Sequence, residues 1–552
     1  MSGSLMSSAL SGLRAAQTGL STTSNNIANV DTEGYNRQNM LLSQSGGSYA
    51  GGLFSGSGVN VEGVQRQYQQ YLSTQLNDAS SELKASESHL SQISQIDNLL
   101  ADDGAGLNTS MQNFFAGLQT VADNPADTAA RQAMLGNAES MASQFRSTGE
   151  YLNNMGENTA AQMRGALGEI NSYASQIAEL NVQIPQTRAK TGAEPNDMLD
   201  QRDLALSKLS ELAGVSMFEQ DGKYNVTLST GDMLVAGDRA QSLEMTASRS
   251  DPTREVVGLR ASSGTLAELD EDQLQEGTLG GLVQFRNQSL ESTQQRLDQM
   301  AHVLSSRLNQ VHESGRDLQG NAGIPLFDTA SPAVSANSRN QGEGVPTVSF
   351  APESGPDSTA NLERVAASNY RLTVDAAQQQ GYTLTRESDG QEVSAAEAGI
   401  EIGGVADLSQ GDRFIIKPLA GAAGSLAVNE AMTPEKIAAR GGDTQEGVRG
   451  NSNALAMANV QSERLVNGSS TLNTAYASMT SDVGNRTATL QDRNEAQTQI
   501  TQELRSAQQS FSGVNLDEEA ANLLKFQQYY SANAQMIRAS SEMFDTLLGI
   551  MR

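Results

Sequence analysis

Residues 516–552, LDEEAANLLKFQQYYSANAQMIRASSEMFDTLLGIMR, decide the fold class, because apolar side chains recur in this stretch at every seventh position. The repeat consists of Leu516, Leu523, Tyr530, Ile537, Phe544 and Met551. A seven-residue repeat keeps one seam of a helix facing a partner helix and favours a left-handed coiled coil. Such a narrow seam needs its partner, since most helix stability in proteins comes from packing the apolar face. The stretch therefore predicts a helix that belongs to a coiled coil.

The start of the chain carries a matching stripe, which consists of Met6, Leu13, Leu20 and Ile27. Small or short side chains accompany it at Ala9, Ala16 and Thr23. We therefore predict a terminal coiled-coil assembly domain made of residues 1–45 and 514–552. The two helices could pack on each other within one molecule. Small neighbours also let further helices approach closely, so we favour packing between molecules.

Four more stripes with the same spacing predict long helices in a helical body, residues 46–330 and 440–513. The first runs from Leu76 to Leu100. The second ends at Ile184, where Pro185 is expected to stop the helix. The third runs from Leu290 to Val311 and ends near Gly315, and the fourth runs from Val483 to Phe511.

The remaining segments predict strands and breaks. Alternating residues after Asp221-Gly222 favour a hairpin in a β region near 215–260, and short apolar runs favour an inserted β-rich outer domain at 331–439. The Gly- and Ser-rich segment 43–58 predicts turned or flexible backbone. Asn515 is expected to cap the last helix, with Glu518 completing a capping box. The fold class is therefore mainly α with β parts, in an elongated multidomain protein.

The composition excludes several classes of function. The formal net charge is −28, with 36 Lys and Arg against 64 Asp and Glu, which argues against binding to nucleic acid or an anionic membrane. Cysteine is absent, so the chain has no disulfide and no thiolate metal site. No stretch approaches the roughly 18 apolar residues of a membrane-spanning helix, and the start lacks the basic and apolar regions of a secretory signal. We expect a cytoplasmic protein, or one secreted without a cleaved signal.

No catalytic set is found in the sequence. The histidines are His89, His302 and His312, and we expect them at the surface or at its edge, because the last two are ten residues apart rather than the four of a helical metal site. Residues 317–321 resemble a calcium loop only in part, since the bidentate Glu is missing. We therefore predict no enzyme activity, no metal and no cofactor.

The two ends also carry a family signature. Ser24-Asn25-Asn26-Ile27-Ala28-Asn29 is followed by Gly34-Tyr35-Asn36-Arg37, and residues 512–519 are followed by 527–535. Both segments resemble the terminal signatures of the bacterial flagellar rod, hook and junction proteins. The signature residues that we carry over are Asn25, Asn26, Gly34, Tyr35 and Arg37. Residues 195–203 and 279–286 are similar to the junction members of this group.

The resemblance implies a structural role. A junction member forms a ring of subunits between hook and filament, is needed for filament assembly, and is secreted through type III export to the extracellular flagellum. The implied partners are further copies of the chain, the hook protein, the second hook–filament junction protein, and an export chaperone at the C-terminal seam before secretion. Two alternatives stay open: another axial protein such as hook protein, and a secreted adhesin-like protein that uses the β insert.

Overall fold

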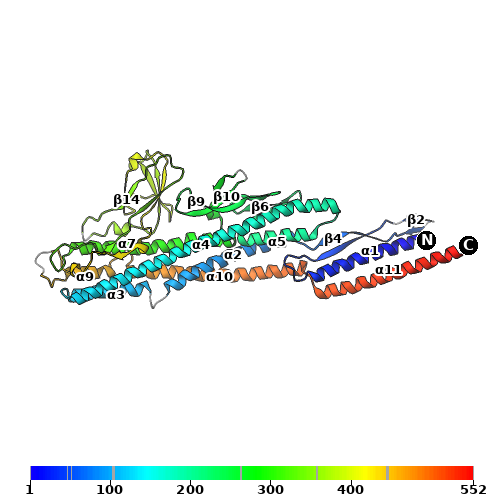
Figure 1. Ribbon diagram of the computed structural model, residues 1–552, viewed down its shortest axis with the longest axis horizontal. Coiled ribbons are helices and arrows are strands. Elements are labelled where there is room, and N and C mark those ends of the chain that lie inside the picture. The colour runs from blue at the N-terminus through cyan, green and yellow to red at the C-terminus, as the bar shows by residue number, and fades with distance from the viewer. Residues whose placement is uncertain are drawn as a thin grey trace.

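The computed structural model describes residues 2–46, 48–50, 53–101, 106–261, 264–355, 358–442 and 447–550. The molecule is long and narrow, and its two termini lie together at one end (Figure 1). Long helices dominate and several small sheets lie beside them, which confirms the predicted fold class. No helix among the described residues has the length and apolar character needed to cross a membrane.

The helical body is built on the predicted heptad stripes. α10 packs along α2, α3 along α4, and α7 against α4 and α9. Their apolar residues form one core, in which Phe114, Phe145 and Phe285 have no exposed surface. The helices of the described chain are α1 Ser2–Ala28, α2 Gln70–Leu100, α3 Leu107–Asp123, α4 Thr128–Thr191, α5 Asn196–Leu212, α6 Gly277–Gln284, α7 Glu291–Ser314, α8 Ala422–Ser425, α9 Ser452–Asn459, α10 Leu472–Ser512 and α11 Leu516–Ile550.

The expected helix end at Pro185 is wrong. α4 is 64 residues long and continues through Pro185 to Thr191, where Gly192 takes the left-handed conformation with φ 69°. A proline inside a helix costs about 3 kcal/mol because it removes one hydrogen bond and crowds the preceding turn. The buried side chains of Asn181 and Ile184 hold this turn of the helix against the body, which offsets the local cost.

The β region of the body contains the predicted hairpin. β5 (Val215–Gln220) pairs with β6 (Lys223–Leu228) across Asp221 and Gly222, which have φ of 53° and 77°. A two-residue hairpin turn whose twist matches that of the two strands needs positive φ at both of its central residues. The sheets are β5-β6-β7-β8 and β11-β10-β9, with β7 Met233–Ala236, β8 Arg239–Ala240, β9 Ser242–Ala247, β10 Glu255–Arg260 and β11 Leu266–Glu268.

The Gly- and Ser-rich segment 43–58 was predicted to be turned or flexible, and its described part contains the antiparallel pair of β2 with β3. Gly47, Gly51 and Gly52 lie outside the described residues. The segment is flanked by a second antiparallel pair, β1 with β4, which packs beside α1. Their bounds are β1 Gln38–Gln44, β2 Ser48–Ala50, β3 Leu53–Ser55 and β4 Val59–Arg66. Strand pairing therefore carries the chain from the terminal helix back to the body (Figure 1).

The insert stands out from the side of the body (Figure 1). Its sheets have the orders β13-β18-β15-β16 and β14-β17, around a core of its own that includes Tyr370, Leu372 and Phe414. The strands are β12 Phe327–Asp328, β13 Ala333–Ala336, β14 Thr347–Phe350, β15 Tyr370–Val374, β16 Tyr382–Arg386, β17 Ile400–Gly403, β18 Arg413–Lys417 and β19 Ala427–Val428.

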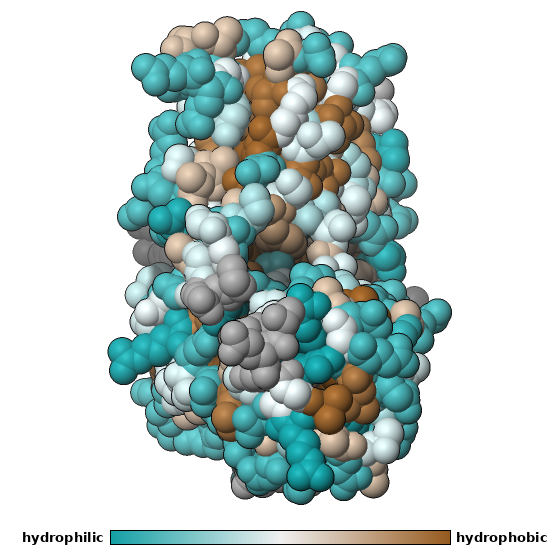
Figure 2. All heavy atoms as spheres, turned by 90° about the vertical axis from the view of Figure 1, so that its left-hand side faces the viewer, coloured by the Kyte–Doolittle hydropathy of each residue, from teal (hydrophilic) through white to brown (hydrophobic). Residues whose placement is uncertain are grey.

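Viewed from the end opposite the termini, the surface of the molecule is mostly hydrophilic, with hydrophobic residues gathered mainly in the upper part (Figure 2).

The end of the insert differs from the predicted boundary at residue 439. Leu426 and Ile437 lie in the core of the helical body, and β19 pairs with β12 rather than with the sheets of the insert. The four-stranded sheet ends with β18 at Lys417. We therefore propose that the inserted unit spans residues 331–417.

Candidate assembly surface

The terminal helices α1 and α11 pack on each other as an antiparallel pair. Two glycines of α1, seven residues apart, allow the close approach: a Cβ on Gly12 would lie 2.5 Å from the Asn533 side chain, and one on Gly19 would lie 2.7 Å from the Phe526 ring. Beside them Ala9, Ala16 and Thr23 are buried. The contact between the two helices within one molecule therefore runs along small residues.

The predicted apolar seams lie to the sides of this contact. On α1, Met6 is 45% exposed, while Leu13, Leu20 and Ile27 are partly buried. On α11, Leu516, Tyr530 and Phe544 are 51%, 38% and 54% exposed, and Leu523 and Ile537 are partly buried. Met551 lies outside the described residues. One molecule thus leaves most of both seams at least partly open.

Exposed apolar side chains are concentrated on these two helices. Among the described residues, ten of the twenty large hydrophobic side chains with the greatest exposure belong to α1 or α11. Besides the seam residues they are Leu5, Leu10, Leu524, Tyr529, Met536 and Met543. Exposed apolar patches on a soluble protein mark interaction surfaces. We name the exposed apolar residues of α1 and α11 the terminal apolar surface.

The signature residues form the joint between the terminal helices and the body. Asn26 is 1% exposed, and its side chain donates to the backbone oxygen of Gln38 at 3.0 Å and accepts from the backbone N–H of Gln38 at 2.9 Å. The Tyr35 hydroxyl donates to the same Asn26 oxygen at 2.8 Å. Burial, with Asp197, Asp200 and Glu519 nearby, raises the pKa of the Tyr35 hydroxyl, so this hydroxyl remains a donor.

Arg37 connects this joint to the last helix. Its guanidinium donates to Glu519 at 2.8 Å and to Glu518 at 2.6 Å, and its backbone N–H donates to the Ser512 oxygen at 2.8 Å. Asn515 caps α11 as predicted, since its side-chain oxygen accepts from the backbone N–H of Asp517 at 2.9 Å. Glu518 pairs with Arg37, and no return bond from its carboxylate to Asn515 is seen in the described contacts.

The other two signature residues play smaller parts. Gly34 has φ of 81°, a conformation that favours glycine, and a Cβ there would lie 3.0 Å from Leu204 of α5. Asn25 is exposed and accepts a hydrogen bond from the Asn29 side chain. The structure therefore brings Asn26, Gly34, Tyr35 and Arg37 together at the joint and leaves Asn25 at its surface.

The sequence did not predict that acidic side chains of α5 bind residues next to the signature. Asp200 accepts from the Asn36 side chain at 2.7 Å and from Arg66 at 2.9 Å, and Arg66 also contacts Asp203 at 2.5 Å. Burial raises the pKa of Asp200 despite the bonds from Arg66 and Asn36. Residues 195–203 match the family in sequence, but no local pattern in them indicates that Asp200 and Asp203 bind Asn36 and Arg66.

The histidine prediction is wrong, because all three side chains are buried. His89, His302 and His312 are 6%, 3% and 0% exposed, each held in a different part of the body. Burial lowers the pKa of each imidazole to about 4. Asp317 of the calcium-like loop accepts from the backbone of Gln319 and Asn321, as in a turn. No group of metal-binding side chains is found in the part of the chain that the structure describes.

Comparison with known proteins decides the family. Flagellar hook-associated protein 1 of Salmonella typhimurium is 38% identical over 99% of this chain and 100% of its own length. The chain belongs to the flagellar hook-associated protein 1 family. The Escherichia coli member is 37% identical over 99% of this chain and all of its own length, and the Bacillus subtilis member is 25% identical over 98% and 96%.

Domain and structure comparisons agree with this family. The "flagellar hook-associated protein FlgK helical domain" matches residues 93–327, and two flagellar basal body rod models match residues 6–36 and 507–550. The structure of the flagellar hook junction protein FlgK from Burkholderia pseudomallei is similar, with a TM-score of 0.71 and 27% identity over 79% of this chain and all of that one. The resemblance inferred from the terminal signatures is thus confirmed. The hook-associated protein 1 chain is an extracellular flagellar component that assembles with other axial proteins.

Proposed function

We infer that the chain is a structural subunit of the flagellar hook–filament junction, needed to attach the filament. The observation that carries this inference is the terminal apolar surface, which a single folded molecule leaves open at one end. Leaving so much apolar surface in water is unfavourable by about 25 cal/mol for each Å², so the surface favours a partner. The names of the relatives, which refer to the flagellar hook and its junction, support a partner in that region.

We further propose that neighbouring copies supply the first partner. A ring or tube of subunits uses heterologous contacts, in which one face of a molecule packs on a different face of the next. Within the terminal apolar surface, the exposed apolar residues of α1 form one such face and those of α11 form another. The hook protein and the second hook–filament junction protein would contact the ring from its two ends. The role is structural, with no catalytic step.

Before secretion, we propose that an export chaperone covers the apolar side of α11. An amphipathic helix is read in a groove through spaced apolar anchors, here Leu523, Tyr530 and Ile537. Covering these residues prevents assembly inside the cell, and the chain is then secreted by type III export. Purified α11 should compete with the full chain for the chaperone.

Electron microscopy of cells that lack this chain tests the junction role. We expect hooks without filaments and filament protein shed into the medium. A gene copy encoding the intact chain should restore filaments. Hooks that carry normal filaments in its absence would contradict the proposal.

A further inference from the structure

A cleft of about 910 Å³ separates the insert from the β region, and its two walls carry opposite charge. The wall on the insert contains Arg339, Arg371 and Arg413 together with one acidic residue, Glu387, and is basic on balance. The opposite wall contains Glu268, Asp270, Glu271 and Asp272 of the β region and Glu291 of α7. Arg249 and Arg254 lie on this second wall as well, and it remains acidic on balance.

Several of these charges have no ion-pair partner within the described residues. The guanidinium groups of Arg339 and Arg413 form no salt bridge there, whereas Arg371 pairs with Glu387 at 3.1 Å. On the acidic wall, Glu268 accepts from Ser248 and from the backbone of Arg249, and Asp270 caps the 3-10 turn that follows it. Asp272 is exposed and makes no ion pair in the described set. Opposite charges thus face each other across solvent.

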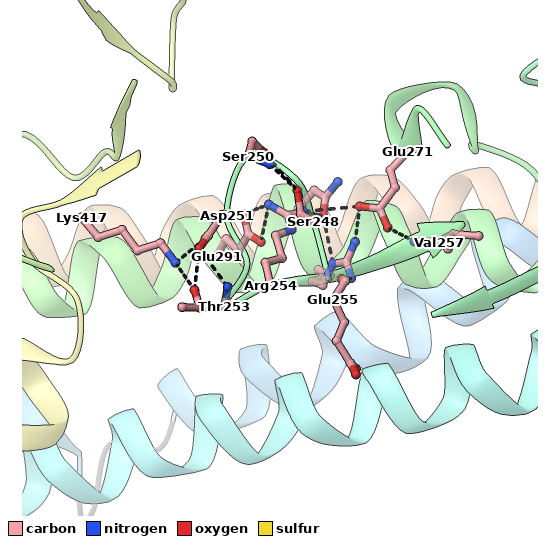
Figure 3. Close-up of polar contacts among 12 residues, drawn as sticks. Ser248, Ser250, Asp251, Thr253, Arg254, Glu255, Val257, Glu271, Glu291 and Lys417 are labelled. Carbon is pink, nitrogen blue, oxygen red and sulfur yellow. Dashed lines mark hydrogen bonds and ion pairs between the residues drawn. The ribbon is translucent and has the colours of Figure 1, made fainter. Parts of the chain in front are cut away.

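Fixed contacts border the cleft and define a pivot. Lys417, the last residue of β18, pairs with Asp251 at 2.5 Å and donates to the Thr253 hydroxyl at 3.0 Å (Figure 3). The backbone N–H of Ser338 donates to the Arg249 oxygen at 2.9 Å. Arg254, Glu271 and Glu291 form a second group of contacts within the body (Figure 3). Ser338 lies next to Arg339, so the bond from Ser338 to Arg249 joins the two walls at one edge of the cleft. A further contact holds the insert to α7, where His302 stacks on Phe350 with ring centroids 3.8 Å apart.

We propose that the insert rocks about the Lys417–Asp251 anchor and closes the cleft by attraction between Arg339 and Arg413 on one wall and the acidic residues on the other. Exposed charges attract one another weakly and are screened over about 8–10 Å at physiological salt. The balance between open and closed forms therefore follows ionic strength. Closure sets how far the insert projects from the body.

Distance measurement between two spin labels tests this closure. The chain has no cysteine, so Ala267→Cys in β11 and Thr383→Cys in β16, the last strand in the order of the insert's four-stranded sheet, give a defined label pair with one label on each unit. We expect the mean distance to shorten in low salt and lengthen in high salt. Arg413→Glu and Asp272→Arg should each lengthen it, and the double variant that exchanges the two charges should restore the short distance.

The control is Arg505→Glu, a charge reversal on exposed α10, which should leave the distance unchanged. Equal unfolding temperatures for all variants establish that folding is intact. A label-to-label distance that changes neither with salt concentration nor with charge reversal overturns the proposal. So does a double variant that fails to restore the short distance, because the effect of each single change would then not come from attraction across the cleft.

Discussion

Arg37 ties three parts of the chain together. Its side chain reaches Glu518 and Glu519, its N–H binds Ser512, and its backbone oxygen accepts from the N–H of Gln67 at 2.7 Å. Glu519 is only 1% exposed, so its charge depends on Arg37 for compensation. A buried carboxylate that loses its partner is costly, unlike an ion pair at the surface.

We therefore predict that Arg37→Ala loosens the start of α11. The expected loss is about 1–3 kcal/mol of local stability, because Glu519 becomes a buried group without its partner. Hydrogen exchange at the first turns of α11 measures it. The matched control is Lys208→Ala, which removes the less buried pairs with Glu33 and Glu211 and should change exchange in α11 little. Equal effects of the two changes would show that the joint does not depend on Arg37.

His312 predicts a pH-dependent stability of the body. In the neutral ring, one nitrogen donates to the Ile324 oxygen at 2.6 Å and the other accepts from the Ala438 N–H at 2.9 Å. Burial lowers its pKa to about 4, against 6.5 in the unfolded chain. The folded state therefore binds fewer protons than the unfolded state, so the contribution of His312 is complete above pH 6.5 and is lost as the pH falls towards 4.

His312→Gln isolates this contribution. We expect the variant to have a lower free energy of unfolding than the original chain at pH 7.5. At pH 5 this difference should be smaller by about 2 kcal/mol, because only the original chain loses the stability that the neutral His312 ring contributes. Urea unfolding at the two pH values measures the difference. A difference that stays constant would contradict the buried neutral ring.

Sequence reasoning identified the joint residues but not what they hold. Asn26, Tyr35 and Arg37 were selected because they match a signature, whereas their roles depend on distant partners. Asn36 meets Asp200 across 164 residues, and Arg37 meets Glu519 across 482. A local pattern in one sequence specifies near neighbours along a helix or strand, so such pairings are visible only in the folded chain. The buried histidines were misjudged for the same reason.

At the scale of elements, heptad spacing predicted α1, α2, α7, α10 and α11 because each stripe is a property of one helix. Heptad spacing did not predict which side of each helix makes the contact between α1 and α11. That contact uses Gly12 and Gly19, which a search for apolar residues passes over, since glycine in a helix is unfavourable until a close neighbour needs the space. At Pro185 the sequence predicted a helix end, but α4 continues because tertiary packing outweighs the local cost of the proline.

The glycine column gives a prediction for the helix pair. Gly19→Leu should force the Phe526 ring away and separate α1 from α11, at a cost of about 1–3 kcal/mol from overpacking. Hydrogen exchange in the middle of both helices should rise accordingly. Gln17→Leu adds the same side chain to an exposed position and serves as the control. Unchanged exchange in the Gly19 variant would contradict the close approach.

The inserted unit gives another prediction at this scale. Ala333 and Lys417 are cross-strand partners, so removing residues 334–416 and joining the ends with a short Gly-Ser linker should leave the body folded. A small loss of stability is expected, because His302 stacks on Phe350 of the insert with ring centroids 3.8 Å apart. Circular dichroism and thermal unfolding measure this. Loss of helical structure would show that the body needs the insert to fold.

At the scale of the whole molecule, the two termini lie at one end and carry the apolar surface there, while the body and insert extend away from it (Figure 1). This arrangement separates the parts of the chain that we expect to meet other subunits from the part that folds alone. We therefore infer that the terminal apolar surface serves assembly and contributes little to the fold of a single molecule.

Replacing Tyr530 and Phe544 together by Asp tests that claim most directly, because these seam residues are 38% and 54% exposed in one molecule. The monomer should keep its unfolding temperature, while each subunit contact should lose several kcal/mol from placing a charge where an apolar group packs. We predict hooks without filaments in cells that make only this variant. The matched control, Gln528→Asp with Gln535→Asp, adds the same charge off the seam and should support filaments. Normal filaments with the Tyr530 and Phe544 variant would contradict the account.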